Sequence, residues 1–278
     1  MKKDKFKRVG CIINPNCKGG RLGKKIPIIG RALKKVFPDA DLVLTKKKGD
    51  ATEIATRMSK DNFDLVLVLG GDGTLNEAVN GLYNAKHTDK IEPVLGIIPS
   101  GTGNDFCRML NIPNSFNNGL EIIKNGKIEL FDFGVVKLLD FNNKKIKKCF
   151  INISDFGIIG DVVLAFNKLS FLKKTRFGFI PYIASFLKKA LLGSRKEVVI
   201  KIDYEEEKEH TINNINIANG MYYGSGVNIS PKSDPQDGYF NLVMLENMNP
   251  LEFTYSMLLA YRGDHLRMKN VNSRKIKR

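Results

Sequence analysis

The chain has 278 residues, 42% of them hydrophobic, which is enough to bury one large core or two modest ones, so two domains are expected. Lysine and arginine number 45 against 29 aspartates and glutamates, and the formal net charge of +16 implies an anionic partner: nucleic acid, an anionic membrane or a polyanionic substrate. The four cysteines show no C-x-x-C spacing and no nearby histidine, so free thiols in a reducing compartment are expected.

The first part of the chain alternates apolar strands with helices. Strands are predicted at residues 9–13, 42–45, 65–69 and 94–98, and helices at 24–36, at 51–60 and around Glu77. This alternation predicts a layered α/β domain.

The pattern changes from residue 128 onward to short β-rich runs with glycine and asparagine. These runs lie at residues 128–136, 149–153, 197–203, 212–218 and 239–243. They predict an antiparallel β-sandwich, interrupted by a helical stretch at 162–192 and with the charged run 204–208 at a hairpin tip. We place the boundary near Asp132, so the two domains are expected at residues 1–132 and 133–278.

The stretch from Gly70 to Glu77 stands where a buried strand passes into a helix. The residues before it, 63–70, are nearly continuous branched aliphatics, typical of a parallel strand covered on both faces. The helix is predicted to have Thr74 as N-cap and Glu77 as its capping-box partner. Glycines let the backbone approach an anion, and the free N–H groups and dipole of the helix favour negative charge there. The segment is therefore predicted to hold phosphate.

The alternative is that this turn is a plain connection, because strand, Gly-Gly and helix also follow one another in α/β folds without any ligand. Asp72 favours the functional interpretation. A carboxylate in a phosphate-binding turn repels the ligand unless it organises a cation or a hydroxyl, and a purely structural turn has no need of it.

Two further strands end in glycine-rich or small polar residues. The strand at 94–98 runs into Pro-Ser-Gly-Thr-Gly-Asn-Asp-Phe at 99–106, and the strand at 9–13 runs into Asn-Pro-Asn-Cys-Lys-Gly-Gly at 14–20. In open α/β sheets, ligands bind beyond the carboxyl ends of the strands. The three loops are therefore expected to converge on one site.

With these motifs the sequence resembles the diacylglycerol kinase catalytic-domain family, soluble lipid kinases that include sphingosine and ceramide kinases. The resemblance rests on Asn14-Pro15 with Gly19-Gly20, on residues 70–77 and 99–106, and later on Asn219-Gly220, Tyr222-Tyr223-Gly224, Gly226 and the run from Pro231 to Phe240. The resemblance covers almost the whole chain, and within the family the sequence most resembles the bacterial diacylglycerol kinases. It implies an ATP-binding α/β domain and a β-sandwich lipid-substrate domain, as in NAD kinases and diacylglycerol kinases.

The resemblance also implies site residues. Those expected to line the ATP site are Asn14, Pro15, Asn16, Cys17, Lys18, Thr45, Gly71, Asp72, Gly73, Thr74, Leu75, Asn76, Glu77 and Thr102. Asp72 is the expected catalytic residue, near the γ-phosphate and its Mg²⁺. A separate Mg²⁺ is expected at Asp234, Asp237 and the carbonyl of Tyr239. Without the family, residues 233–238 form an ordinary turn, whose carboxylates usually bind backbone N–H groups.

The sequence departs from the family in one respect. Family members carry a late Asp-Gly-Glu whose glutamate acts as general base, and this chain contains no Asp-Gly-Glu. Three explanations stay open: a truncated fragment, a variant in which Asp72 or Asp105 takes the proton, or an inactive protein.

The expected function is ATP- and Mg²⁺-dependent phosphorylation of a lipid hydroxyl, with 1,2-diacylglycerol giving phosphatidate. NAD kinases also carry Gly-Gly-Asp-Gly-Thr, but they lack the arrangement seen at 99–106. A non-catalytic nucleotide- or lipid-binding module is the alternative that the missing glutamate supports. A nucleic-acid binder is the weakest alternative, because the charge lacks an interleaved aromatic platform.

The basic segment 173–189 brackets apolar residues with cations and is too short to span a membrane. It is expected either to lie at a membrane interface or to pack on its own domain. No signal peptide is recognised, so a cytoplasmic protein that associates reversibly with the inner face of the membrane is expected. Related kinases often form dimers, so a homodimer is also expected. The histidines His87, His210 and His265 are isolated in polar surroundings, and no metal or catalytic role is expected for them.

Overall fold

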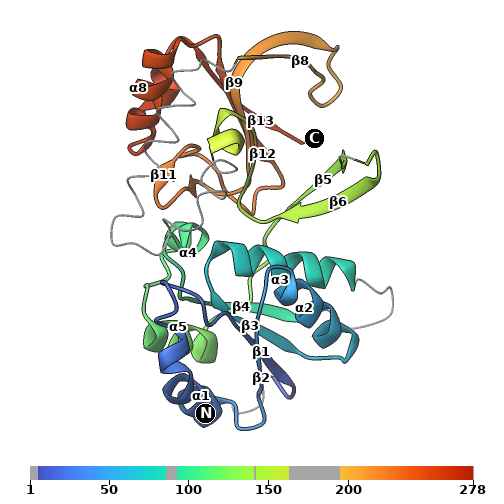
Figure 1. The fold of residues 1–278 in the computed structure, drawn as a ribbon, viewed down its shortest axis with the longest axis vertical. Helices are drawn as coiled ribbons and strands as arrows, with labels where there is room; N and C mark the ends of the chain where they lie inside the picture. Colours follow the sequence, from blue (N-terminus) through green and yellow to red (C-terminus); the bar gives the residue numbers. More distant parts are fainter. Residues whose placement is uncertain (1–5, 86–92, 141, 163–194, 278) are drawn as a thin grey trace. The chain divides into compact units, whose positions relative to one another are not determined.

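The structure is a computed structural model that describes residues 6–85, 93–140, 142–162 and 195–277. It divides into two compact units, residues 1–151 and 152–278 (Figure 1). The predicted domain boundary after residue 132 stays a prediction. The helical stretch expected at 162–192, the segment 173–189 and His87 lie outside the described residues, apart from Val162. Within the described residues, no helix is both long enough and apolar enough to cross a membrane.

The first unit is built on a parallel sheet with the strand order β2-β1-β3-β4. Its strands are β1 (Val9–Ile13), β2 (Asp41–Leu44), β3 (Leu65–Gly70) and β4 (Val94–Pro99). Its helices are η1 (Gly23–Lys25), α1 (Ile26–Val36), α2 (Asp50–Lys60), α3 (Asp72–Asn84), α4 (Asp105–Met109) and α5 (Phe116–Asn125). The predicted layered α/β fold is confirmed.

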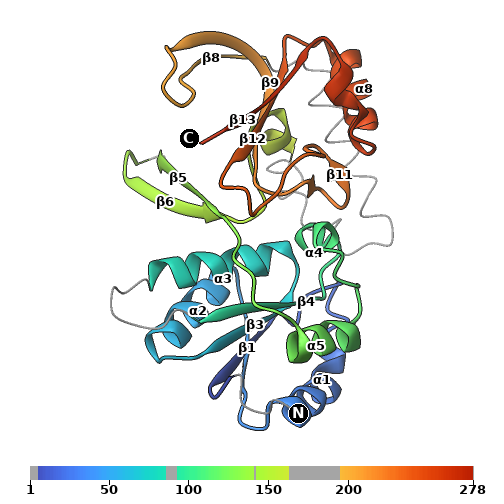
Figure 2. The ribbon, with the colours of Figure 1, turned by 180° about the vertical axis from the view of Figure 1, so that it is seen from behind.

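Both faces of this sheet are covered, as the aliphatic pattern of β3 requires. Leu65, Leu67 and Leu69 point to one face and pack in a cluster with residues of α1 and α5. Val66 and Val68 point to the other face and pack with residues of α2 and α3. The two helical layers are visible on either side of the sheet in Figures 1 and 2. The alternation buries all six residues of the strand.

A two-stranded hairpin of β5 (Gly134–Leu139) and β6 (Lys145–Phe150) completes the first unit. It is tied to α3 by Asn80, whose side-chain Nδ2 donates to the carbonyl of Cys149 at 2.9 Å and whose Oδ1 accepts from the Cys149 N–H at 2.8 Å. The β-rich run predicted at 128–136 is a strand only from Gly134, and the run predicted at 149–153 is divided, because β6 ends at Phe150 and the next strand begins at Ile153.

The second unit contains an antiparallel sheet, which confirms the predicted change of class. The strand order is β13-β12-β9-β7, and β8 also pairs with β9. The elements are β7 (Ile153–Gly157), β8 (Lys196–Ile200), β9 (Lys208–Ala218), β10 (Tyr222–Tyr223), β11 (Val227–Asn228), β12 (Phe240–Glu246), α8 (Pro250–Ala260), η3 (Asp264–Arg267) and β13 (Val271–Ile276). The charged run 204–208 lies at the β8–β9 connection, as predicted.

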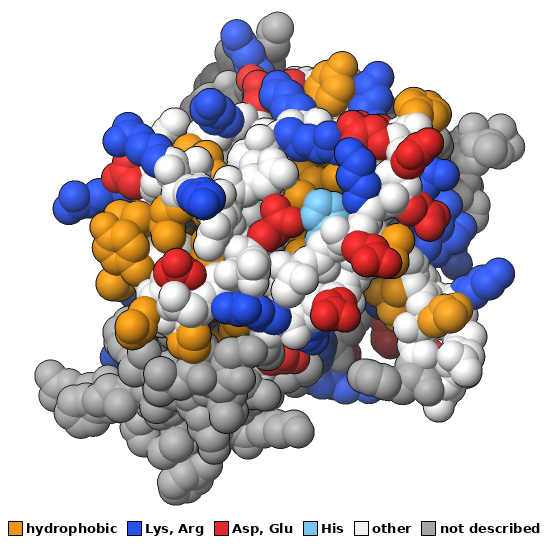
Figure 3. Space-filling model, turned by 90° about the horizontal axis from the view of Figure 1, so that it is seen from above, with side chains coloured by type: hydrophobic (Ala, Val, Ile, Leu, Met, Phe, Trp, Pro, Cys, Tyr) orange, Lys and Arg blue, Asp and Glu red, His pale blue; other side chains and the backbone are white. Residues whose placement is uncertain are grey.

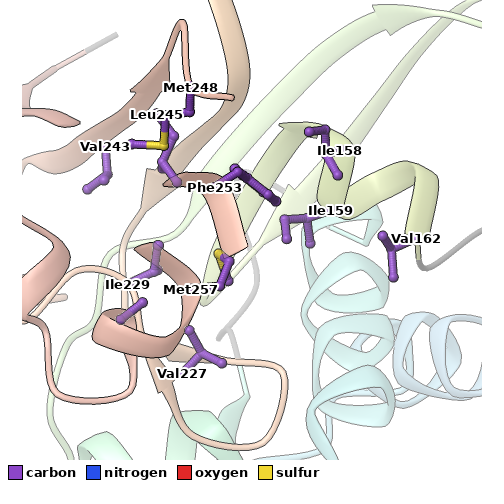
Figure 4. Packing of buried hydrophobic residues seen from close by; sticks show 11 residues of the cluster. Ile158, Ile159, Val162, Val227, Ile229, Val243, Leu245, Met248, Phe253 and Met257 are labelled. Atoms are coloured by element: carbon purple, nitrogen blue, oxygen red, sulfur yellow. The ribbon is translucent and has the colours of Figure 1, made fainter. Parts of the chain in front are cut away.

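Helix α8 packs one face on this sheet. Phe253 and Met257 lie in a cluster with Val243 and Leu245 of β12 (Figure 4). The helix begins with a capping box, in which the Asn249 side chain accepts from the N–H of Glu252 and the Glu252 carboxylate accepts from the N–H of Asn249.

His265 lies in a polar stretch of sequence, but the structure buries it completely. Its Nε2 is 3.0 Å from the carbonyl oxygen of Ile229. Burial lowers the pKa of His265, because the charged imidazolium is poorly solvated there. The histidine is therefore part of the core of the second unit.

We expect His265 to make the stability of the fold depend on pH. Because its pKa is lower in the folded chain than its ordinary value of 6.5, the unfolded chain takes up the proton first as the pH falls. The free energy of unfolding should be highest above pH 6.5 and decrease below it, by at most about 1.4 kcal/mol per pH unit for one proton. Urea unfolding of the wild type and of His265→Gln between about pH 5 and pH 8 tests this. Equal slopes in the two proteins would contradict it.

Candidate functional site

Two of the predicted loops touch through their glycines. A Cβ atom added to Gly71 would lie 2.9 Å from the Cα of Gly101, and one added to Gly101 would lie 2.4 Å from the Cα of Gly71. The N–H of Ser100 also donates to the carbonyl of Gly70 at 2.8 Å. The backbones following β3 and β4 therefore approach so closely that only glycine fits at both positions.

The loop after β1 joins the same edge of the sheet. The N–H of Asn14 donates to the carbonyl of Leu69 at 3.0 Å, and its side-chain Nδ2 donates to Oγ1 of Thr74 at 3.0 Å. The thiol of Cys17 interacts with the backbone of Gly71, although burial is the larger influence and raises its pKa. The predicted convergence of the three loops is confirmed.

Helix α3 begins earlier than predicted, and the prediction of Thr74 as its N-cap is wrong. The N-cap is Gly71, which carries no side chain that could cap the helix, and Thr74 lies in the first turn. The carboxylate of Glu77 does not complete a capping box either, since it accepts from the N–H of Gly49 at 3.0 Å. The N–H groups of the first turn, which have no partner within the helix, are thereby left to a ligand or to solvent.

Asp72 has a structural role, whereas the sequence analysis expected that a purely structural turn would not need this carboxylate. Its Oδ2 accepts from the N–H of Asp105 at 3.1 Å, and its Oδ1 accepts from the N–H of Phe106 at 3.1 Å. Both N–H groups belong to the first turn of α4, so the carboxylate caps that helix across the loops.

Asn104 is a supporting residue that the sequence prediction missed. It is buried, with a φ of 50°, and its Oδ1 accepts from the N–H of Gly101 at 2.8 Å. Its Nδ2 donates to the carbonyl of Gly101 at 3.0 Å and to Oδ1 of Asn114 at 3.2 Å. Asn114 in turn accepts from Nζ of Lys18 at 3.5 Å. The only local signal was an asparagine following glycine, a residue tolerant of positive φ.

The remaining predicted residues divide into exposed and buried ones. Gly73, Thr102 and Lys18 are exposed, and an added Cβ on Gly73 would meet nothing within 4 Å. Pro15 and Asn16 lie in the same loop, where Asn16 is exposed and its N–H donates to Oδ1 of Asn14 at 3.0 Å.

Thr45 is buried just after β2, where its N–H donates to the carbonyl of Ile13 at 2.9 Å. It is followed by the exposed cations Lys46, Lys47 and Lys48. The N–H groups of Lys46 and Lys47 donate to Asp50 and lower the pKa of that carboxyl, which fixes the basic loop to the start of α2.

Leu75 and Asn76 make structural contacts within the first unit. The Leu75 side chain is buried in a cluster with Val79 and Phe106, and its N–H donates to the carbonyl of Gly71 at 3.0 Å. Oδ1 of Asn76 accepts from the N–H of Ile151 at 3.3 Å. A surface groove of about 560 Å³ between α2 and α3 contains none of the predicted site residues. It is lined by Thr52, Glu53, Thr56, Arg57, Lys60, Asp61 and Asn84.

The second predicted site, in the second unit, forms the turn that the alternative interpretation describes. Oδ1 of Asp234 accepts from the N–H of Gln236 at 3.0 Å, and Oδ1 of Asp237 accepts from the N–H of Tyr239 at 2.9 Å. Nζ of Lys275 lies 2.6 Å from Oδ2 of Asp237, and this hydrogen bond raises the pKa of the lysine. Among the described residues, no three His, Cys, Asp or Glu side chains gather as a metal site. The role of this loop in binding Mg²⁺ stays a prediction.

Comparison with known proteins supplies the family. Residues 8–136 match the model of the diacylglycerol kinase catalytic domain, and residues 160–278 match that of the YegS C-terminal NAD kinase beta sandwich-like domain. A diacylglycerol kinase of Staphylococcus saprophyticus is 32% identical over 274 residues, which are 98% of this chain and 83% of that protein. The chain belongs to the diacylglycerol kinase family.

Other proteins named as diacylglycerol kinases are also similar to this chain. A diacylglycerol kinase of Staphylococcus aureus is also 32% identical, over 98% of this chain and 81% of its own length. A solved structure from Bacillus anthracis has a TM-score of 0.68 at 25% identity, covering 98% of this chain and 84% of its own. The family is one of lipid kinases, which makes the loops around Gly71 the candidate active site.

The contact between Gly71 and Gly101 can be tested with two alanine substitutions. Gly101→Ala should lower the free energy of unfolding by roughly 1–3 kcal/mol, because its methyl group meets backbone that cannot rotate away. Gly73→Ala is the matched control, since its methyl group meets only open space and alanine favours helix by up to about 1 kcal/mol. Urea unfolding of both variants measures the difference. Equal stability of the two would refute the close approach.

Lys275 allows a test of the second predicted site. If Asp234 and Asp237 bind Mg²⁺, the Lys275 ammonium opposes it, and Lys275→Gln should tighten binding about thirtyfold, since a unit charge about 4 Å from a divalent ion is worth about 2 kcal/mol in water. Binding of Mn²⁺ as a Mg²⁺ substitute, followed by electron paramagnetic resonance, measures this. Lys277→Gln is the control, because Lys277 and Lys275 both lie over the ring of Tyr239, whereas the ion pair with Asp237 is made by Lys275. Unchanged Mn²⁺ binding in Lys275→Gln and in Asp237→Asn would exclude the loop as a metal site.

Proposed function

We propose that this chain transfers the γ-phosphate of ATP to the hydroxyl group of a lipid, most directly 1,2-diacylglycerol, giving phosphatidate and ADP. The observation that carries the proposal is the juxtaposition, in a member of the diacylglycerol kinase family, of glycine loops, the N-terminus of α3 and the Asp72 carboxylate. Phosphoryl transfer needs positioning and charge neutralisation more than covalent chemistry, and these groups supply both.

The nucleotide phosphates are proposed to bind at the first turn of α3. The N–H groups of Asp72, Gly73 and Thr74 stand at the positive end of the helix dipole, and Gly73 leaves room for a phosphate. Lys18 and Thr102 are exposed on the flanking loops and add a cation and a hydroxyl. Asn16 and the cations after Thr45 supply further polar groups at the same edge of the sheet.

Mg²⁺ is the cation proposed to accompany ATP. The donors at the first turn fit this ion, because a carboxylate has about four lone-pair sites and Asp72 gives only two of them to N–H groups. When bound, the ion neutralises charge on the phosphates. Asp72 is thus proposed to do two things, holding the start of α4 in place and keeping carboxylate lone pairs available to Mg²⁺.

In the proposed reaction, the lipid hydroxyl oxygen forms a bond to the γ-phosphorus as the bond from that phosphorus to the bridging oxygen of ADP breaks. The hydroxyl proton must pass to a base. The family's Asp-Gly-Glu does not occur in this sequence, so a non-catalytic nucleotide- or lipid-binding module is the second candidate function. The net charge of +16 supports a lipid acceptor at an anionic surface, reached from the cytoplasm. A homodimer stays a prediction.

The first experiment measures transfer of labelled phosphate from γ-labelled ATP and Mg²⁺ to diacylglycerol in mixed micelles. Sphingosine, ceramide, monoacylglycerol and NAD serve as parallel acceptors. Labelled phosphatidate would support the proposal, and labelled NADP would favour an NAD kinase instead. ATP binding without any labelled product would favour the binding module.

Asp72→Asn should lower the rate of transfer by at least about a hundredfold, because it removes the carboxylate proposed to hold the Mg²⁺ that accompanies ATP. Asp64→Asn is a matched control, since Asp64 also accepts from two backbone N–H groups, those of Lys7 and Arg8, at the opposite end of β3. Both variants should lose some stability, but only Asp72→Asn should lose transfer. A normal rate in Asp72→Asn would remove the catalytic role of this residue.

A further inference from the structure

Helix α8 has an apolar outer face that is exposed and lies outside the core clusters formed by the described residues of the second unit. Its inner residues, including Phe253, Met257 and Ala260, are buried against the sheet. On the outside, the exposed fractions are 78% for Leu251, 57% for Tyr255, 65% for Leu258 and 53% for Tyr261. These residues are spaced by four, three and three positions, as on one side of a helix. We call them the α8 stripe.

An exposed helix face of a globular domain is normally polar, so the α8 stripe indicates a contact with an apolar phase. The residue types of the stripe indicate which apolar phase it contacts. Leucine side chains enter the acyl region, and tyrosine rings with their polar hydroxyls are enriched at membrane interfaces. In the view of Figure 3, hydrophobic side chains gather on the side where α8 lies in Figure 1, with lysine and arginine beside them.

Cations stand at both ends of the α8 stripe. At its start, Nε of Arg195 donates to the carbonyl of Met248 at 3.2 Å. At its end, Arg262 and Arg267 are exposed, and Lys232 follows Pro231, which lies against Gly263.

The nearby carboxylates are both engaged. Glu252 belongs to the capping box, and Asp264 lies 3.6 Å from Arg267, so the excess of positive charge comes from Arg195, Arg262 and Lys232. The rim of the stripe is therefore suited to an anionic partner.

We propose that the α8 stripe is the surface by which this protein lies on an anionic lipid bilayer. The apolar side chains enter the boundary between headgroups and acyl chains, and the cations at both ends bind anionic headgroups. The inference deepens the proposed function, on which it rests, by naming the surface that would bring a lipid kinase to its substrate.

The chain contains no tryptophan, so a single tryptophan reports on one position. Tyr255→Trp places it in the α8 stripe, and Tyr204→Trp is the control at the exposed β8–β9 hairpin. With vesicles of phosphatidylglycerol, the emission of Tyr255→Trp should shift to the blue and be quenched by brominated lipid, while that of Tyr204→Trp stays unchanged. Equal quenching of both, or of neither, would overturn the proposal.

Charge substitutions provide a second arm. Arg262→Gln and Arg267→Gln should each weaken binding to phosphatidylglycerol vesicles about fivefold, whereas Lys34→Gln and Lys35→Gln on α1 should not. Vesicles of phosphatidylcholine should bind weakly throughout. A blue shift that grows with protein concentration in the absence of lipid would mean that a second copy covers the stripe, and would overturn the proposal.

These outcomes are separable from those of the kinase assay. Vesicle binding through the α8 stripe without phosphate transfer would leave this inference standing and remove the proposed activity. Transfer to diacylglycerol in micelles without quenching of Tyr255→Trp by brominated lipid would do the reverse.

Discussion

The close approach of Gly71 and Gly101 is the constraint on which the candidate active site depends. The sheet order places β3 beside β4, and the parallel register carries Gly70 level with Pro99, so the two chains leave the sheet together. A side chain on either glycine would force the loops apart. The start of α3 and the start of α4 then lie close together. The carboxylate of Asp72, in the first turn of α3, can therefore accept hydrogen bonds from N–H groups in the first turn of α4.

That carboxylate, Asp72, explains why an acid is compatible with a site proposed for phosphates. Two backbone N–H groups of α4 already hold its oxygens, so its charge is partly compensated within the protein before any nucleotide binds. The same arrangement means that a loss of activity in a variant of Asp72 has two physical causes, the missing charge and a displaced α4.

The sequence predicted the parts of this structure that depend on local pattern. The strands and helices of the first unit follow from hydrophobic alternation, and the convergence of the loops follows from parallel strand order. The predicted start of α3 was wrong because the Thr74 hydroxyl accepts a hydrogen bond from the side chain of Asn14, sixty positions earlier in the sequence. No local window of sequence contains both residues. His265 was judged by its polar neighbours in sequence, whereas burial is set by the elements that pack over it. Asn104 was missed because its partners depend on how its own turn closes.

In the second unit, a single irregularity in the pairing of β9 and β12 determines the position of helix α8 and its outer face. Between β9 and β12 the register shifts at Leu245 and Glu246, so that Asn213 has no partner across the ladder. Its side chain instead accepts from the N–H of Met248 at 2.8 Å and donates to the carbonyl of the same residue at 3.0 Å. Buried and bonded at both its nitrogen and its oxygen, this amide fixes where the chain leaves β12 and therefore where α8 begins. The inner face of α8 then packs into the core, and the residues of its outer face take no part in the core clusters of the described residues. An exposed apolar face such as the outer face of α8 lowers the solubility of the protein. A contact of this face with a partner outside the domain offsets that cost.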